Sequence, residues 1–143
     1  MFPVEERFTQ ALHGGARAWR AALERHLKAR GITLAGWRAL AAVAAAEHAL
    51  SQRELAQQLG VDGATLVSTI DRLMAGKLVE RRPGPYDRRV KLVVLTDAGH
   101  EVSSMIRNDM ALLRRMIAER IDAGRVAAAA EVLEEVQHLL EGA

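Results

Sequence analysis

Side chains suited to contacting a nucleic acid gather between positions 62 and 91. The first group shares one helical face, is small or hydroxyl-bearing apart from one cation, and consists of Gly63, Thr65, Ser68, Thr69 and Arg72. Leu66, Ile70 and Leu73 recur at i, i+4 and i+7 on the opposite face, which predicts an amphipathic helix. A slim polar face can approach base edges closely and can also donate hydrogen bonds to phosphates.

A cationic group follows directly in the sequence. Residues 72–91 contain seven Lys or Arg against two acids, a local charge of +5, whereas the whole chain contains 20 against 18, a charge of +2. The candidate phosphate contacts are Arg72, Arg81, Arg82, Arg88, Arg89 and Lys91. Phosphate binding needs a local positive patch rather than a high global charge. Such a run also fits a solvated surface, but the helices before it favour double-stranded DNA as the partner.

Two capped helices are predicted to position these groups. Ser51 and Glu54 have the spacing of a capping box at the start of the first helix. Gly60 lies where a left-handed residue would end that helix. Asp62 is a good N-cap for the second helix, and Gly76 ends it. The segment therefore predicts a helix-turn-helix.

A basic hairpin is predicted after the second helix. Residues 78–82 form its first strand, 83–87 carry two prolines and a glycine suited to a turn, and 88–95 form its second strand. The second strand alternates an apolar side and a partly cationic side, formed respectively by Val90, Leu92, Val94 and by Arg89, Lys91, Val93. A short extended piece at 48–50 is expected to pair with the hairpin and complete a three-stranded wing.

Long helices are predicted on both sides of this lobe. The first spans 3–28, with Gly14 and Gly15 expected to weaken or bend it. Arg30-Gly31 ends it and Thr33 caps the next helix, whose inward positions are Leu34, Trp37, Leu40, Ala41 and Ala44. Thr96 and Asp122 cap two further helices, the first of them spanning 97–120.

The charge and the apolar content of these flanking helices indicate a role in assembly rather than in DNA contact. Residues 97–143 carry nine acids and five arginines, so this segment should stay off DNA. Alanine-rich helices bury little area each, and an apolar start at Phe2, Val4 and Phe8 would be exposed in a monomer. An intertwined homodimer is expected, with residues 1–30 and 97–143 as dimerisation helices and 33–96 as the DNA-binding lobe.

Several classes of protein are excluded or disfavoured by composition. The chain has no cysteine, hence no disulfide, no thiolate zinc site and no thiol redox switch. No two of its five histidines are spaced at i, i+3 or i+4, so local spacing gives no metal site, although distant ligands could converge. No cofactor and no membrane span are expected, and without a signal pattern the protein is expected in the cytoplasm.

An enzyme is not expected either. The chain has no βαβ unit with a glycine-rich phosphate loop, and no catalytic triad or carboxylate pair can be placed. The alternative to a DNA-binding regulator is a winged-helix protein-interaction module that binds no effector. The charge of +5 over residues 72–91 argues against that alternative.

The order of elements and several strings resemble the MarR family of bacterial transcription regulators. That family carries D-x-R on the wing and L-T-x-x-G where a long dimer helix begins, and both occur in DRRVKLVVLTDAG at 87–99. GITLAGWRALAAVA, RELAQQLGVDGATL and IDRLMAGKLVERR also fit its pattern. The resemblance covers essentially the whole chain. It implies a mostly α fold with a small β-hairpin wing, a winged helix-turn-helix with N- and C-terminal dimerisation helices.

The resemblance also implies roles for particular residues. The dimer would bind a pseudo-palindromic operator, most commonly as a repressor, with recognition helices in successive major grooves. Arg89 matches the wing arginine placed in or beside a minor groove, where it can sense groove width. Asp87 matches the acid that steadies it, and Asp62 stands where some members have an acid paired to that arginine. Ser68 departs from the larger basic or polar side chain of many members.

By the same resemblance, a small aromatic or phenolic acid would bind between the dimer helices and the DNA-binding lobe and release the operator. The candidate ligand contacts are Trp19, His26, Trp37 and Arg38. Each also fits another role, since both tryptophans lie on core stripes and the other two fit solvated surface. An anionic ligand needs a cation or a helix N-terminus.

Overall fold

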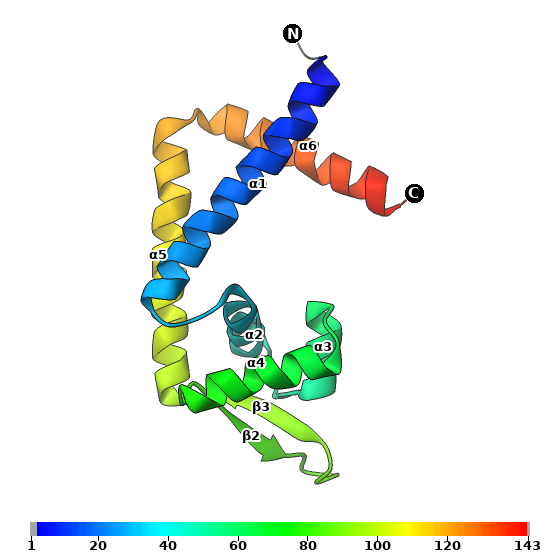
Figure 1. Cartoon of the computed structure of the whole chain (residues 1–143), viewed down its shortest axis with the longest axis vertical. Coiled ribbons are helices and arrows are strands. Elements are labelled where there is room, and N and C mark those ends of the chain that lie inside the picture. Colours follow the sequence, from blue (N-terminus) through cyan, green and yellow to red (C-terminus); the bar gives the residue numbers. More distant parts are fainter. Residues whose placement is uncertain (1–2, 143) are drawn as a thin grey trace. The chain divides into compact units, whose positions relative to one another are not determined.

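The computed structural model describes residues 3–142 and consists mostly of helix (Figure 1). The helices are α1 (Val4–Ala29), α2 (Leu34–Ala45), α3 (Gln52–Leu59), α4 (Gly63–Ala75), α5 (Asp97–Arg120) and α6 (Ala123–Glu141). The strands are β1 (Leu50–Ser51), β2 (Val79–Pro83) and β3 (Lys91–Leu95). This confirms the predicted mostly α fold with a three-stranded wing. Phe2 lies outside the described residues, and Val4 is exposed.

The chain forms two compact units, one ending at Arg107 and the other beginning at Asn108. Their boundary falls inside α5, so that helix contributes to both. The first unit contains α1, the helix-turn-helix and the sheet, and the second contains the remainder of α5 together with α6.

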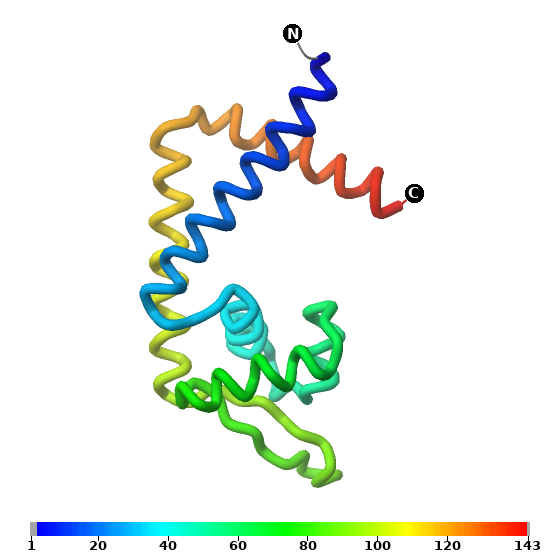
Figure 2. The backbone as a smooth tube through the Cα atoms, in the orientation of Figure 1, coloured from blue at the N-terminus to red at the C-terminus, as the bar shows by residue number. Residues whose placement is uncertain are grey.

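The helix-turn-helix of the first unit forms where the caps predict it. The Glu54 amide donates to Ser51 Oγ at 3.0 Å, and the Ser51 amide donates to Glu54 Oε1 at 3.2 Å, which completes the capping box. Gly60 adopts φ +67°, a left-handed conformation that ends α3 without the steric cost of a Cβ. Asp62 caps α4, and Gly76 is its C-cap. Figure 2 shows the resulting sharp turn between α3 and α4.

Buried side chains of the helices and the sheet form one core, which holds the helix-turn-helix and the wing together. Its fully buried side chains include Leu40 of α2, Leu55 of α3, Ile70 of α4 and Val93 of β3. Trp37 is buried as expected, whereas Leu34, Ala41 and Ala44 are half-buried. Gly36 and Ala39 are buried as well, which shows that α2 turns a broader face inward than the predicted stripe.

The sheet has strand order β1-β3-β2, with every pair antiparallel. Leu50 and Ser51 pair with Val93 and Leu92, so the extended piece predicted at 48–50 does complete the wing, shifted by about one residue. β2 is likewise shifted by one residue from the predicted 78–82.

The predicted alternation of the second wing strand is wrong. Val93, assigned to the cationic side, is completely buried, and Val90, assigned to the apolar side, is exposed. The turn extends further than expected, because the Val90 amide donates to Asp87 O and the Gly84 amide donates to Val90 O. β3 therefore starts at Lys91 rather than at 88, and its central position puts Val93 between β1 and β2.

A tight joint links the wing to α5. Thr96 Oγ1 donates to the Lys77 carbonyl at 2.7 Å and accepts from the Gly99 amide at 3.0 Å, so it caps α5 while holding the start of the wing. A Cβ on Gly99 would clash with the Leu78 carbonyl oxygen. This close approach gives a physical reason for the L-T-x-x-G string, since only glycine fits at its last position.

The first helix is continuous through Gly14 and Gly15, so the expected weakening there produces no break. It ends at Arg30 and Gly31, the latter at φ +71°. Thr33 then caps α2 by accepting from the Gly36 amide at 3.0 Å.

The second unit consists of two helical segments, the C-terminal part of α5 and α6. Asp122 caps α6 by accepting from the Arg125 amide at 3.1 Å. None of the described residues of α6 is buried, and its Leu139 and Leu140 are each 73% exposed. Within residues 3–142, no helix combines the length and apolar character that crossing a membrane requires. Over the same range, no three acidic or histidine side chains are close enough together to hold a metal ion.

Candidate nucleic-acid interface

Helix α4 presents a small polar face to solvent. Leu66, Ile70 and Leu73 bury its other side, which leaves Thr65, Ser68 and Arg72 exposed. Ser68 and Ala64, one turn earlier, are small and exposed, so the helix backbone can come close to base edges on this face.

The N-terminus of α4 is ordered by Asp62. Its carboxylate accepts from the Thr65 amide at 2.7 Å and from Thr65 Oγ1 at 3.0 Å. These hydrogen bonds, the backbone one first, lower the pKa of Asp62 below its usual range. Because the Thr65 hydroxyl donates to Asp62, its lone pairs remain available to accept from a base amino group.

Thr69 and Gly63 lie at the margins of this face. Thr69 is half-buried, and its hydroxyl donates to the Thr65 carbonyl at 3.1 Å. Together with Arg72, it lines a cavity of about 200 Å³ on the side of α4 that faces the α1–α2 connection and α5. Gly63 is exposed in the first turn, with open space around its Cα.

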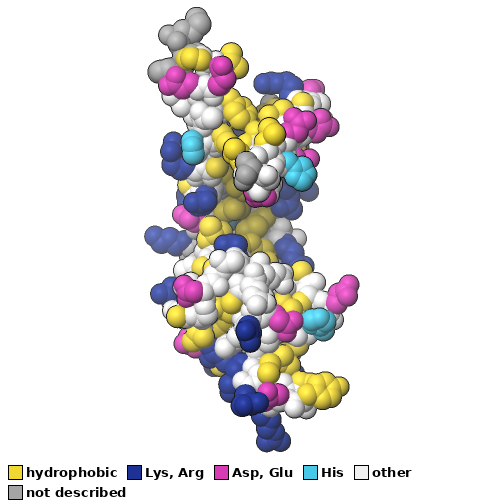
Figure 3. Space-filling model, turned by 90° about the vertical axis from the view of Figure 1, so that its right-hand side faces the viewer, with side chains coloured by type: hydrophobic (Ala, Val, Ile, Leu, Met, Phe, Trp, Pro, Cys, Tyr) yellow, Lys and Arg dark blue, Asp and Glu magenta, His cyan; other side chains and the backbone are white. Residues whose placement is uncertain are grey.

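The wing carries several exposed cations of the candidate interface. Arg88, Arg89 and Lys91 are all exposed, and in Figure 3 dark-blue Lys and Arg side chains gather over the lower end of the molecule, where the hairpin lies. Arg82, on the outward side of β2, pairs with Glu80 at 3.2 Å.

Arg89 is oriented by Asp87 in a bidentate pair. Its Nε donates to Asp87 Oδ1 and its Nη2 donates to Asp87 Oδ2, both at 3.2 Å, and its amide donates to Oδ1 at 3.0 Å. These bonds lower the pKa of the Asp87 carboxyl, the Arg89 side chain being the larger cause. The Arg89 side chain remains 92% exposed, so the pair directs it without covering it. Asp62 instead caps α4, as described above, and does not take the place of Asp87.

Arg81, predicted as a phosphate contact, is turned toward the helices instead. Its side chain is only 22% exposed and forms an ion pair with Asp71 of α4 at 2.8 Å. Its Nε donates to Gln52 Oε1, and its other nitrogens donate to Met74 Sδ and to the Val67 carbonyl. Thus one wing side chain contacts both helices of the helix-turn-helix.

Sequence reasoning missed Gln52 and Asp71 as partners of Arg81, because they are 29 and 10 residues away. The strand period could have indicated that Arg81 faces inward. Side chains alternate along a strand, so Arg81 shares the face of the buried Val79, while Glu80 and Arg82 share the outer one. A count of charges over residues 72–91 does not distinguish these two faces.

The four candidate ligand residues lie on α1 and α2 and differ in burial. Trp37 is buried in the lobe core, while Trp19 and His26 are half-buried along α1. Arg38 donates to the Leu59 carbonyl at 3.2 Å and so caps the C-terminus of α3.

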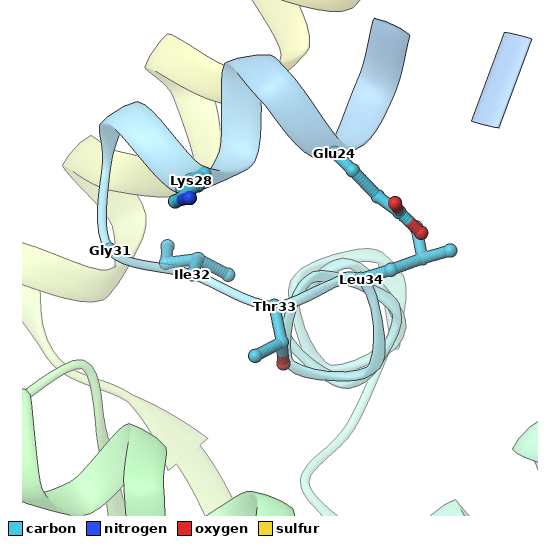
Figure 4. Close-up of a pocket in the computed structure, with 6 residues that line it drawn as sticks. All are labelled: Glu24, Lys28, Gly31, Ile32, Thr33 and Leu34. Carbon is cyan, nitrogen blue, oxygen red and sulfur yellow. The ribbon is translucent and has the colours of Figure 1, made fainter. Parts of the chain in front are cut away.

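A cavity of about 390 Å³ is lined by residues that are close in sequence to Trp19, His26, Trp37 and Arg38 but include none of these four. Glu24 and Lys28 of α1 border it, together with Gly31, Ile32, Thr33 and Leu34 of the following turn (Figure 4). Glu24 supplies a carboxylate, Lys28 a cation, and Ile32 and Leu34 apolar surface, so Lys28 is the side chain of this lining that can pair with a small amphiphilic anion.

The arrangement of a capped helix-turn-helix followed by a cationic three-stranded wing defines a winged-helix DNA-binding protein. A family model described as the MarR family matches residues 30–90. A solved structure of the transcriptional regulator PA3341 is 35% identical, with a TM-score of 0.76, covering 95% of this chain and 99% of that one. A cysteine-to-serine mutant of MarR from E. coli, complexed with operator DNA, is 27% identical, with a TM-score of 0.77, covering 91% and 93%.

The chain belongs to the MarR family and is a DNA-binding transcriptional regulator. Members of this family regulate transcription and are not enzymes. YusO from Bacillus subtilis, at 18% identity and a TM-score of 0.77, covers 94% of this chain and 95% of its own and has the same fold.

Proposed function

We propose that this chain is a homodimeric repressor of a pseudo-palindromic operator, released by a small aromatic or phenolic acid. The α4 helix of each protomer enters a major groove, and each wing tip lies beside a minor groove. Residues 33–96 form the DNA-binding lobe, and residues 1–30 and 97–143 dimerise. The single observation that carries the DNA assignment is the exposed Arg89, oriented by Asp87 on the wing that follows the helix-turn-helix.

The proposed contacts follow from exposure and chemistry. Thr65 and Ser68 read base edges, while Arg89 enters or borders the minor groove. Phosphate and flanking contacts are made by Gly63, Thr69, Arg72, Arg82, Arg88 and Lys91. Asp87 and Asp62 act indirectly, the first by aiming Arg89 and the second by fixing the start of α4.

Dimerisation is supported by the second unit. Its exposed large apolar side chains include Leu112, Met116, Ile117, Ile121, Val132, Leu133, Leu139 and Leu140. A small chain gains stability by covering such surface with a second copy, and a two-fold dimer gives the two half-sites that a pseudo-palindrome needs.

Binding to random-sequence duplex at two salt concentrations tests the DNA assignment. Five proposed cationic contacts per protomer (Arg72, Arg82, Arg88, Arg89 and Lys91), ten per dimer, predict a loss of affinity of at least about a thousandfold between about 50 and 200 mM salt. Selection from a random duplex pool should then yield a site with related half-sites. Salt-independent binding, or no binding at low salt, contradicts this proposal and leaves the protein-interaction module as the hypothesis to pursue.

The effector assignment is supported by the cavity beside α1 and α2. Its volume of about 390 Å³ is in the range of small-molecule sites, and Lys28 can pair with a carboxylate while Ile32 and Leu34 contact a ring. A thermal-shift screen of aromatic carboxylates should find a stabilising compound that also releases the operator. Lys28→Met should abolish the shift, and Arg25→Met, one turn earlier on α1, should retain it.

A further inference from the structure

Four contacts join Arg81 of the wing to the helix-turn-helix. The ion pair to Asp71 and the bonds to Met74 and the Val67 carbonyl reach three successive turns of α4, and the bond to Gln52 reaches the first turn of α3. A guanidinium can satisfy such a divergent set because its donors point in fixed, different directions.

Asp71 gives this cluster an electrostatic role. Its side chain is 57% exposed on α4, on the solvent-facing side of a helix assigned to the major groove. An unpaired carboxylate there would repel nearby phosphates. Arg81 compensates that charge from the wing, so the positive charge of Arg81 is already used within the lobe.

We propose that Arg81 is a positioning residue, which fixes the wing relative to α4 and neutralises Asp71 instead of contacting a phosphate. This inference rests on the proposed function, because it concerns how one lobe addresses two grooves at once. The wing and α4 contact different grooves, so an operator is matched only if their relative orientation is held. Random duplex, bound through phosphates, imposes that requirement less strictly.

Arg81→Lys is the decisive variant. Lysine keeps the charge but is a single ammonium, which cannot hold Gln52, Asp71 and the Val67 carbonyl together. We expect it to weaken binding to the selected operator about tenfold, with a smaller loss on random duplex and an unchanged slope of log affinity against log salt. Near-wild-type operator binding by Arg81→Lys would falsify the positioning role.

Asp71→Asn provides an independent measurement on an exposed position that should not prevent folding. Because Asp71→Asn also removes a negative charge from the proposed DNA-facing side, it favours binding to every duplex whatever the role of Arg81, and the ratio of operator to random affinity is the decisive quantity. If Arg81 were a phosphate contact, releasing it from Asp71 would strengthen binding to both duplexes alike. A positioning role predicts a reduced ratio of operator to random affinity, and an unchanged or increased ratio overturns the proposal.

Arg82→Met is the matched control, because Arg82 is the next residue on the same strand but faces outward. It should weaken binding to the operator and to random duplex alike. The slope of log affinity against log salt should fall in magnitude by about one for each phosphate contact that is lost. Melting temperatures of all variants separate altered DNA recognition from unfolding. If Arg82→Met behaves as expected and Arg81→Lys matches wild type, only the Arg81 inference fails. If wild-type protein binds no duplex, the proposed function fails and the inference fails with it.

Discussion

The DNA-binding lobe and the C-terminal unit use apolar side chains in different ways. The lobe covers its own core, with Leu40, Leu55, Ile70 and Val93 fully buried. In the unit from Asn108 onward, none of the described residues of α6 is buried, although that helix is rich in alanine, valine and leucine. The lobe therefore completes its packing within one chain, whereas α6 presents apolar surface that requires a second surface to cover it.

The two regions also differ in charge. Residues 72–91 carry +5, while residues 97–143 carry nine acids against five arginines. A polyanion such as DNA is attracted to the first region and repelled by the second. Packing and charge thus both support the proposed division of the chain into a DNA-binding lobe and dimerisation helices.

The largest effect is expected from charging α6. Leu139→Asp with Leu140→Asp should convert the proposed dimer to a monomer, since each leucine covered in such a dimer would contribute about 1.5–3 kcal/mol and a two-fold interface counts each change twice. Sedimentation measures the assembly, and hydrogen exchange should show protection lost in α6 but retained in α4 and β3. Glu134→Gln is the control for α6. A variant that remains dimeric at low concentration would place the interface elsewhere.

The second-largest effect, on the free energy of unfolding, is expected at the joint between the wing and α5. Gly99→Ala puts a Cβ against the Leu78 carbonyl oxygen, so the backbone must shift, at a cost of about 3 kcal/mol in the free energy of unfolding. Urea denaturation measures this cost.

Gly15→Ala is the matched control for Gly99→Ala, because a Cβ at Gly15 meets no atom within 4 Å in the middle of α1. It should raise the free energy of unfolding by about 0.5–1 kcal/mol, by removing conformational freedom from the unfolded chain. Equal effects of the two alanines would show that the close approach at Gly99 does not control the joint.

Much of this organisation could be predicted from local sequence signals. Ser51, Gly60 and Asp62 specify their caps through backbone geometry and side-chain chemistry within three residues, and each formed as predicted. The phase of β3 could not be derived in the same way. Val90, Leu92, Val93 and Val94 are all apolar, so the register depends on where the turn ends and on pairing with β1, both of which are tertiary facts.

The candidate interface shows the same limit. Composition locates the cationic segment, but it cannot separate Arg81 from Arg82, which differ only in the face of β2 that they occupy. Aromatic and basic residue types indicate Trp19, His26, Trp37 and Arg38 as ligand contacts, whereas the cavity close to them in sequence is lined by Glu24, Lys28 and the α1–α2 turn. Concavity arises from how helices meet, and a single sequence gives no direct signal for it.

An effect of about 1–3 kcal/mol on operator binding is expected for Arg89→Ala. The variant removes an exposed cation that Asp87 orients, and the lost minor-groove contact should appear as weaker operator affinity with unchanged thermal stability. Arg125→Ala is the control from the acidic region, since it removes the same charge from α6. Titration of labelled operator compares the two. Similar losses from both variants would mean that overall charge, rather than the wing, governs binding.

The smallest effect is expected from the capping box of α3. The Ser51 amide, and then the Ser51 hydroxyl, lower the pKa of Glu54 from its ordinary value of 4.5. Because the folded-state pKa lies below the unfolded one, the stabilisation is fully present above pH 4.5 and is lost as the pH falls through the lowered value. Glu54→Gln can keep the hydrogen bond to the Ser51 amide without titrating. Its free energy of unfolding, followed by tryptophan fluorescence during urea titrations, should therefore decline less than that of wild type over this acidic range. Parallel curves for the two proteins would mean that the box does not contribute to the acid sensitivity of the lobe.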